Sequence, residues 1–221
     1  MVLSLMEELL LLALREKGEK GRVKFGGVDL RYGLAAAALA DLSLQGKIEW
    51  DKHQQVRVLE KMPGSDPLLN GILAELAKVR KPKKLSYWIN TLGENGKQYQ
   101  KQIIANLVTK GFLQVEDGRY LWVIPYQVYT QTNASAKYQV KHRLRAIVLA
   151  GEKHDEYAAA LLSLAQAIDL LDHVFTVDEI KSARKRVQTL VQDDAVGAAV
   201  AEVLQDIAAA ATAAALGAIS T

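Results

Sequence analysis

The sequence predicts a mainly α-helical protein, a single domain over residues 1–221 that carries two small β-hairpins. Three observations favour this fold. Half of the 221 residues are hydrophobic, which is enough for a well-buried core. Apolar residues recur at helical spacing through most of the chain. Alternation of polar and apolar residues is confined to two short stretches, each of which predicts a hairpin.

The helix predicted within residues 29–49 organises the rest of the chain. Ala35 to Ala38 leave this helix almost no polar face, so we expect it to lie inside the core. Gly46 is well placed to end it in a left-handed cap. Residues 47–50 and 55–59 then alternate between polar and apolar side chains, which predicts the first hairpin directly after the central helix.

A shorter helix is predicted before the central one. Ser4 and Glu7 have the spacing of a capping box, in which each side chain satisfies a free backbone N–H of the first turn. This helix is expected to run to about Arg15. Residues 16–27 are polar and rich in glycine, so they are expected to form a connecting loop or a short hairpin.

The second hairpin is predicted over residues 112–124, because Asp117-Gly118 between two apolar runs favours a tight turn. A polar stretch from Pro125 to Asn133 follows it. Helical spacing accounts for the other segments, and Asp66-Pro67 suits the start of the first of them. The first of these helices runs from residue 67 to the charged run that begins at residue 78. The others are predicted for residues 85–92, 97–110, 134–149, 155–171, 176–192 and 195–218.

Composition restricts the classes of function. The formal net charge of +3 is mildly basic, which permits an anionic partner without requiring one, so no obligate nucleic acid is expected. The chain has no cysteine, which excludes disulfides and thiolate nucleophiles. No secretory signal is recognisable at the N-terminus, and the Ala-rich segment 207–219 is too short to span a bilayer. We expect a cytoplasmic protein, and self-association into a homo-oligomer is compatible with the sequence.

Motifs of common enzymes are not found in the sequence. It contains no P-loop, no dinucleotide fingerprint, no nucleophile elbow and no pair of histidines at metal-binding spacing. We therefore predict that the protein is not an enzyme and that it needs no cofactor or metal.

Basic residues offer a better candidate site. Lys137, Lys141 and Arg145 recur every fourth residue on the helix predicted for 134–149, so they are expected to share one face, with His142 nearby. Such a stripe is either a solubilising surface or a site for phosphate oxygens. The sequence leaves both interpretations open.

Two blocks of residues resemble the Golgi phosphoprotein 3 family of phosphoinositide-binding proteins. The first block is LSLMEELLLL at residues 3–12, and the second runs from Tyr32-Gly-Leu to Leu42-Ser-Leu-Gln-Gly-Lys-Ile48. The order of the later elements agrees with the family over nearly the whole chain. The resemblance implies a Golgi phosphoprotein 3-like helical fold and binding of phosphatidylinositol 4-phosphate, or of another anionic lipid head group, by a peripheral membrane protein.

The same resemblance implies where the lipid site would lie. The family's head-group aromatic residue aligns with Gly26, beside Phe25, and its arginine aligns with Ala35, four residues after Arg31. The family's later basic positions fall near Gln139 and His142 on the helix that carries the Lys137, Lys141 and Arg145 stripe. The implied lipid contacts are Phe25, Arg31, Lys137, Lys141, His142 and Arg145.

Two further expectations concern partners. The basic run at residues 78–84 is either a solvated linker or a face that meets an anionic phospholipid membrane surface. An alternative function is nucleic-acid binding through residues 85–124, whose helix, turn, helix and hairpin follow the order of a winged helix. In that case Lys97 and Lys101 would contact phosphates.

Overall fold

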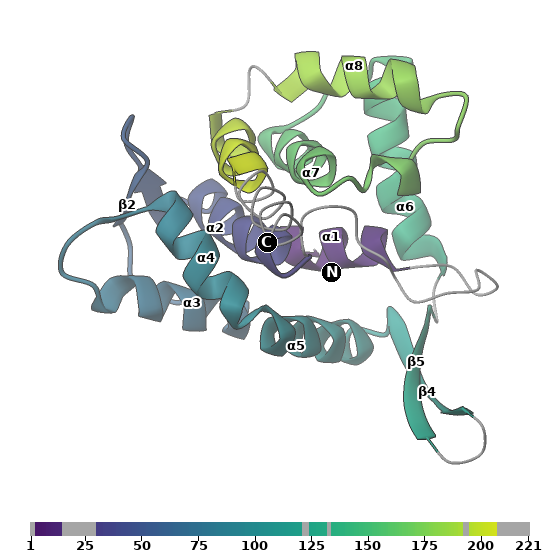
Figure 1. Cartoon of the computed structure of the whole chain (residues 1–221), viewed down its shortest axis with the longest axis horizontal. Coiled ribbons are helices and arrows are strands. Elements are labelled where there is room, and N and C mark those ends of the chain that lie inside the picture. Colours follow the sequence, from purple (N-terminus) through teal and green to yellow (C-terminus); the bar gives the residue numbers. More distant parts are fainter. Residues whose placement is uncertain (1–2, 15–29, 121–123, 132–133, 192–194, 207–221) are drawn as a thin grey trace, which may run out of the picture.

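The computed structural model describes residues 3–14, 30–120, 124–131, 134–191 and 195–206. Figure 1 shows α1 and α2 near the centre, with α3, α4 and α5 on one side of them and α6, α7 and α8 on the other. The predicted mainly helical fold is confirmed. The helices are α1 (Leu5–Ala13), α2 (Leu30–Leu44), α3 (Pro67–Lys78), α4 (Leu85–Glu94), α5 (Gly96–Thr109), α6 (Ala134–Arg145), α7 (Glu156–Ala167) and α8 (Ile180–Val191).

Three further helical segments complete the set in the described residues. A π-helical turn over Ala146–Ala150 continues α6, a 3-10 turn covers Leu171–His173, and residues 195–206 are helical. The helix predicted for residues 176–192 begins only at Ile180. The remainder of the predicted last helix, from residue 207, lies outside the described residues, as does the loop predicted for residues 16–27.

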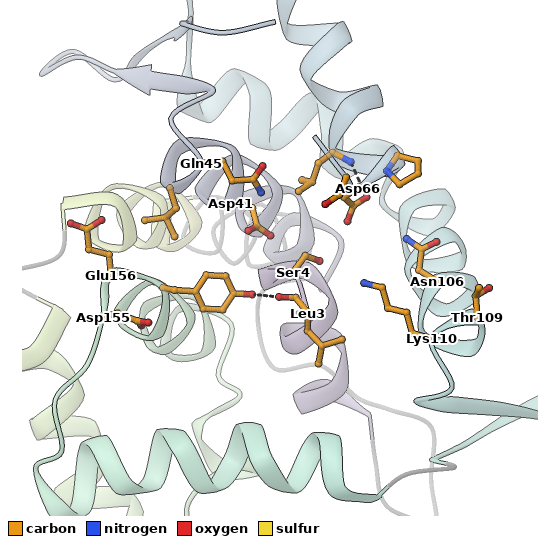
Figure 2. Close-up of a pocket in the computed structure, with 15 residues that line it drawn as sticks. Leu3, Ser4, Asp41, Gln45, Asp66, Asn106, Thr109, Lys110, Asp155 and Glu156 are labelled. Carbon is orange, nitrogen blue, oxygen red and sulfur yellow. Dashed lines mark hydrogen bonds between the residues drawn. The ribbon is translucent and has the colours of Figure 1, made fainter. Parts of the chain in front are cut away.

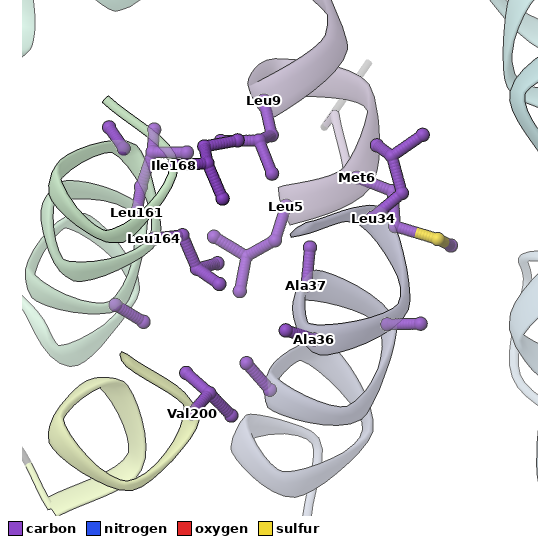
Figure 3. Packing of buried hydrophobic residues seen from close by; sticks show 14 of the residues in the cluster. Leu5, Met6, Leu9, Leu34, Ala36, Ala37, Leu161, Leu164, Ile168 and Val200 are labelled. Carbon is purple, nitrogen blue, oxygen red and sulfur yellow. The ribbon is translucent and has the colours of Figure 1, made fainter. Parts of the chain in front are cut away.

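The central position of α2 follows from its small side chains. Every residue from Leu34 to Ala40 is completely buried. Figure 3 shows Ala36 and Ala37 of α2 facing a cluster that contains Leu5 of α1 and Leu164 of α7. Because alanine occupies little space, neighbouring helices can pack closely against α2 on several sides.

The predicted start of the first helix and the predicted end of the central helix are confirmed. The Ser4 hydroxyl accepts a hydrogen bond from the Glu7 N–H at 3.3 Å, and the Ser4 N–H donates to the Glu7 carboxylate at 2.9 Å. Helix α2 ends at Leu44, and Gly46 follows it with a φ of +68°. This left-handed backbone is the one that glycine adopts without strain.

The first hairpin is confirmed, but it has a third strand that the sequence analysis missed. Strand β1 (Ile48–Trp50) pairs with β2 (Gln55–Val58), and β2 also pairs with β3 (Lys83–Lys84). The end of the basic run at 78–84, interpreted as a linker or a membrane face, is therefore an edge strand. Two residues are too few for an alternating pattern, so only the fold reveals this pairing.

The turn predicted for the second hairpin is wrong. Strand β4 (Leu113–Tyr120) pairs with β5 (Ile124–Gln131), and Asp117 and Gly118 lie opposite Gln127 and Tyr126 inside the ladder. The last pair of the ladder is Tyr120 with Ile124, so the two strands continue past the predicted turn. This register pairs all eight residues of each strand, and the backbone hydrogen bonds of the longer ladder outweigh the local preference of Asp-Gly for a turn.

Two glycines bring α4 and α5 close to the start of α2. A Cβ atom on Gly93 would overlap the ring of Tyr32, and one on Gly96 would overlap the side chain of Arg31. A ring packed between helices cannot move aside without displacing its own neighbours. These two positions therefore hold the first turn of α2 in place.

Replacing Gly93 with alanine is expected to lower the free energy of unfolding by about 1–3 kcal/mol, because the added methyl group overpacks the contact with Tyr32. Urea denaturation followed by circular dichroism would measure the loss. The matched control is Gly71→Ala in α3, where an added Cβ meets no atom within 4 Å. That change should leave stability unchanged or raise it by roughly 0.5–1 kcal/mol. Equal effects of the two substitutions would contradict the packing argument.

Candidate functional site

Two of the predicted lipid-binding residues, Arg31 and Lys137, lie near the same end of α1. Helices α1 and α2 are antiparallel, because the Leu5 N–H donates to Asp41 at 2.7 Å while Leu9 lies beside Gly33. The end of α1 therefore lies next to the beginning of α2, which carries Arg31. Phe25 belongs to residues 15–29, outside the described residues.

Lys137 lies at this end too, but its side chain is buried. It is 4% exposed, and its ammonium group donates a hydrogen bond to the carbonyl oxygen of Leu14, which caps α1. Carbonyl groups at a helix C-terminus lack partners within the helix and carry partial negative charge, so they attract a cation. The expected exposed stripe of Lys137, Lys141 and Arg145 is corrected here, because its first member stabilises the end of α1.

Arg145 is also bound within the protein. Its two terminal nitrogens each contact one carboxylate oxygen of Glu179 at 2.6 Å, and one of them also donates to the Val174 carbonyl at 3.2 Å. The hydrogen bonds from Arg145, together with the Thr176 N–H, lower the pKa of Glu179 to about 2. This bidentate ion pair joins α6 to the segment before α8, so Arg145 has a structural contact that the sequence pattern does not reveal.

The other predicted residues of α6 lie nearer the surface. Lys141 is half-buried and His142 is exposed, with its ring centroid 5.8 Å from that of Tyr138. The next residue, Arg143, is partly exposed, and a nitrogen of its guanidinium group lies 2.5 Å from the Glu8 carboxylate. Helix α6 therefore presents a mixed face, in which some cations meet solvent and others hold α1.

Arg31 is half-buried on the first turn of α2. Its guanidinium carbon lies 5.8 Å from the ring centroid of Tyr32, a distance typical of a cation–π contact. The stem of Arg31 packs against Gly96. The side chain is thereby held at the end of the core where residues 15–29 leave α1 and enter α2.

Two carboxylates of α1 make contacts that the sequence pattern did not predict. Glu7 and Glu8 are 1% and 5% exposed, and Glu7 binds Lys110 of α5 at 2.7 Å. Burial raises the pKa of Glu8, although the nearby Arg143 acts in the opposite direction. A signal was present in the sequence: apolar residues occupy every side of this helix, so it has no polar face on which a glutamate could meet solvent.

A comparison with protein-family models matches residues 5–207 to Golgi phosphoprotein 3 (GPP34). The chain belongs to the Golgi phosphoprotein 3 family. A search of curated proteins found no match. Membership of the Golgi phosphoprotein 3 family is consistent with lipid binding in general. None of the helices in the described ranges is long and apolar enough to cross a membrane.

This Golgi phosphoprotein 3 family member also has a cavity of about 1030 Å³ near the other end of α1 (Figure 2). Its lining includes the carboxylates of Asp41, Asp66, Asp155 and Glu156, whereas its one cation, Lys110, is bound to Glu7. An anionic head group would be repelled by this lining. None of the predicted lipid-binding residues that the structure describes lines the cavity.

Asp41 is a buried acid of that cavity. Its carboxylate accepts the hydrogen bond from the first N–H of α1, and burial raises its pKa to about 7. No three His, Cys, Asp or Glu side chains are grouped to hold a metal ion within the part of the chain that the structure describes. The acidic lining of this cavity therefore suits neither an anionic head group nor, among the described residues, a metal ion.

Proposed function

We propose that this protein binds the head groups of anionic phospholipids and thereby associates with the surface of a membrane. Membership of the Golgi phosphoprotein 3 family is the observation that carries the proposal. Phosphatidylinositol 4-phosphate is the first candidate ligand, because the family resemblance implies it. No catalytic step is part of the proposed activity.

The geometry favours some of the candidate contacts over others. Arg31, Lys141 and His142 are half-buried or exposed, which makes them better candidates for a head-group contact than the buried Lys137. Lys137 and Arg145 support the same site indirectly, since one binds the end of α1 and the other binds Glu179. Phe25 keeps the role of an apolar neighbour in this proposal.

Vesicle co-sedimentation tests the function. The protein is expected to bind vesicles that contain phosphatidylinositol 4-phosphate more tightly than vesicles of equal charge made with phosphatidylserine, at physiological salt. Each Lys or Arg near an anionic surface contributes about 1 kcal/mol, so Arg31→Gln/Lys141→Gln should weaken binding by roughly 30-fold. Circular dichroism would verify that the variant is folded.

The matched control is Lys97→Gln/Lys101→Gln, which removes two exposed cations of α5. This variant should bind vesicles as the wild type does. If Lys97→Gln/Lys101→Gln lost vesicle binding and Arg31→Gln/Lys141→Gln did not, α5 would be the membrane contact. If the wild type ignored all vesicles but bound duplex DNA through Lys97 and Lys101, the lipid function would be wrong and the nucleic-acid alternative would replace it.

A further inference from the structure

A basic pocket of about 340 Å³ lies between β2 and the segment that joins α3 to β3. In Figure 1 the connection from α3 to α4 arches outward on the left of the view. Five of the twelve lining residues are cations, and none is Asp or Glu. The cations are Arg57, Lys61, Arg80, Lys81 and Lys83.

The floor of this basic pocket is apolar and fixed. Val56, Leu76 and Trp88 line it and are 5%, 4% and 5% exposed. Lys83 is held opposite Val56 by the pairing of β3 with β2, and its ammonium group lies 5.2 Å from the centroid of the Tyr87 ring. The fold therefore positions the cations around a preformed hollow.

Nearby carboxylates offset only part of the charge of the pocket, at Arg57, which lies opposite Glu49 in the ladder of β1 and β2. Asp51 is 3.7 Å from the guanidinium of Arg57, a long contact for an ion pair, and that arginine is 58% exposed. Glu60 binds Lys47 at 2.7 Å, and Lys47 does not line the pocket. An anion that entered the hollow would meet an excess of positive charge.

Two large apolar side chains are exposed next to the same cations. Leu59 and Met62 are 56% and 65% exposed, and they flank Lys61 in the loop that follows β2. Burying such side chains at a bilayer interface is favourable, and stable attachment of a peripheral protein usually combines an apolar insertion with basic charge.

We propose that this face is a second membrane contact, in which phosphates of anionic phospholipids enter the basic pocket while Leu59 and Met62 enter the interfacial region of the bilayer. The inference rests on the proposed function, because it assumes that the protein meets an anionic membrane. It concerns a different surface. None of the residues that line the pocket is Arg31, Lys141 or His142, and along α4 the lining residue Trp88 is roughly 7.5 Å from Gly93, which contacts Tyr32 beside Arg31.

A site-specific probe tests the insertion directly. The chain has no cysteine, so Met62→Cys provides a single attachment point for a dye whose emission reports polarity. Adding phosphatidylserine vesicles should shift the emission of this label to the blue. The control is Val177→Cys, because Val177 is 91% exposed and lies just before α8. A blue shift at Val177→Cys with none at Met62→Cys would overturn the inference.

Charge removal tests the pocket. Lys81→Gln/Lys83→Gln should weaken binding to phosphatidylserine vesicles by roughly 30-fold, at about fivefold per charge. If the wild type binds and this variant binds equally well, the second contact is wrong while the proposed function stands. If this variant loses binding and Arg31→Gln/Lys141→Gln does not, the inference stands and the family-type contacts at Arg31 and Lys141 are wrong. A wild type that binds no vesicle overturns both proposals.

Discussion

Replacing Lys137 with glutamate is expected to lower the free energy of unfolding by about 3–5 kcal/mol. The residue is 4% exposed and its ammonium group donates to the Leu14 carbonyl at the end of α1. A glutamate would place a buried negative charge against the negative end of a helix, with no cation to replace the one removed. Urea denaturation of the wild type and the variant would measure the loss.

Two controls separate burial from charge. Lys137→Met keeps the apolar stem and removes only the donor, so it should lower the unfolding free energy by about 1–3 kcal/mol. Lys141→Glu, one helical turn further along α6, should change it by about 1 kcal/mol or less, because Lys141 is half-buried. Equal losses for Lys137→Glu and Lys141→Glu would show that Lys137 has no special structural role.

This result would affect how lipid binding is tested. Charge reversal is a common means of probing a basic stripe, and the spacing of Lys137, Lys141 and Arg145 invites it. In this fold, however, Lys137 binds the end of α1 and Arg145 binds Glu179, so each has a structural contact that charge reversal would break. A variant that loses the contact of Lys137 or Arg145 is destabilised, so weaker vesicle binding by such a variant would not show that the residue contacts lipid. Arg31 and Lys141 are the more informative positions.

The features that the sequence predicted correctly depend on neighbouring residues. A capping box needs only Ser4 and Glu7, a left-handed cap needs only Gly46, and Asp66 caps α3 through the N–H groups of Leu68 and Leu69. Each of these contacts closes within four residues, so a pattern in the sequence contains the whole interaction. The buried central helix was predictable for a related reason, since its alanines exclude a polar face.

The features that the sequence did not reveal depend on distant partners. Strand β3 exists because β2 offers it an edge, and the turn of the second hairpin moves because a longer ladder forms. The spacing of Lys137 and Arg145 placed them on one face of a helix but could not show that α1 and Glu179 occupy that face. The partners of β3, Lys137 and Arg145 lie tens of residues away, and the paired residues of the second hairpin lie up to 18 positions apart, so no local pattern contains these contacts.

Asp41 is expected to make the stability of this protein fall as the pH rises through neutrality. Its carboxyl group is 4% exposed, and burial raises its pKa from an ordinary 3.8 to about 7. Between these two values the folded state keeps a proton that the unfolded state has released, so raising the pH favours unfolding. The contribution of Asp41 is fully present below the lower value and is lost as the pH passes about 7.

The expected size of this effect is large for one side chain. At about 1.4 kcal/mol per pH unit, the free energy of unfolding should fall by about 2–3 kcal/mol between pH 5 and pH 8. Urea denaturation across that range would measure the slope. Glu179, with its pKa lowered to about 2, titrates below this window and does not mask the effect.

Asp41→Asn isolates the contribution of this one group. Asparagine keeps an oxygen that can accept the hydrogen bond from the Leu5 N–H, but it has no charge to desolvate at any pH. The variant should therefore lose most of the slope between pH 5 and pH 8, and it should be more stable than the wild type at pH 8. Comparison of the two proteins cancels the other titrating groups, including Glu8, whose pKa burial also raises. If the unfolding free energies of the wild type and Asp41→Asn changed in parallel with pH, Asp41 would be ionised in the folded protein throughout this range. Its hydrogen bond with the start of α1 would then offset the desolvation of its charge.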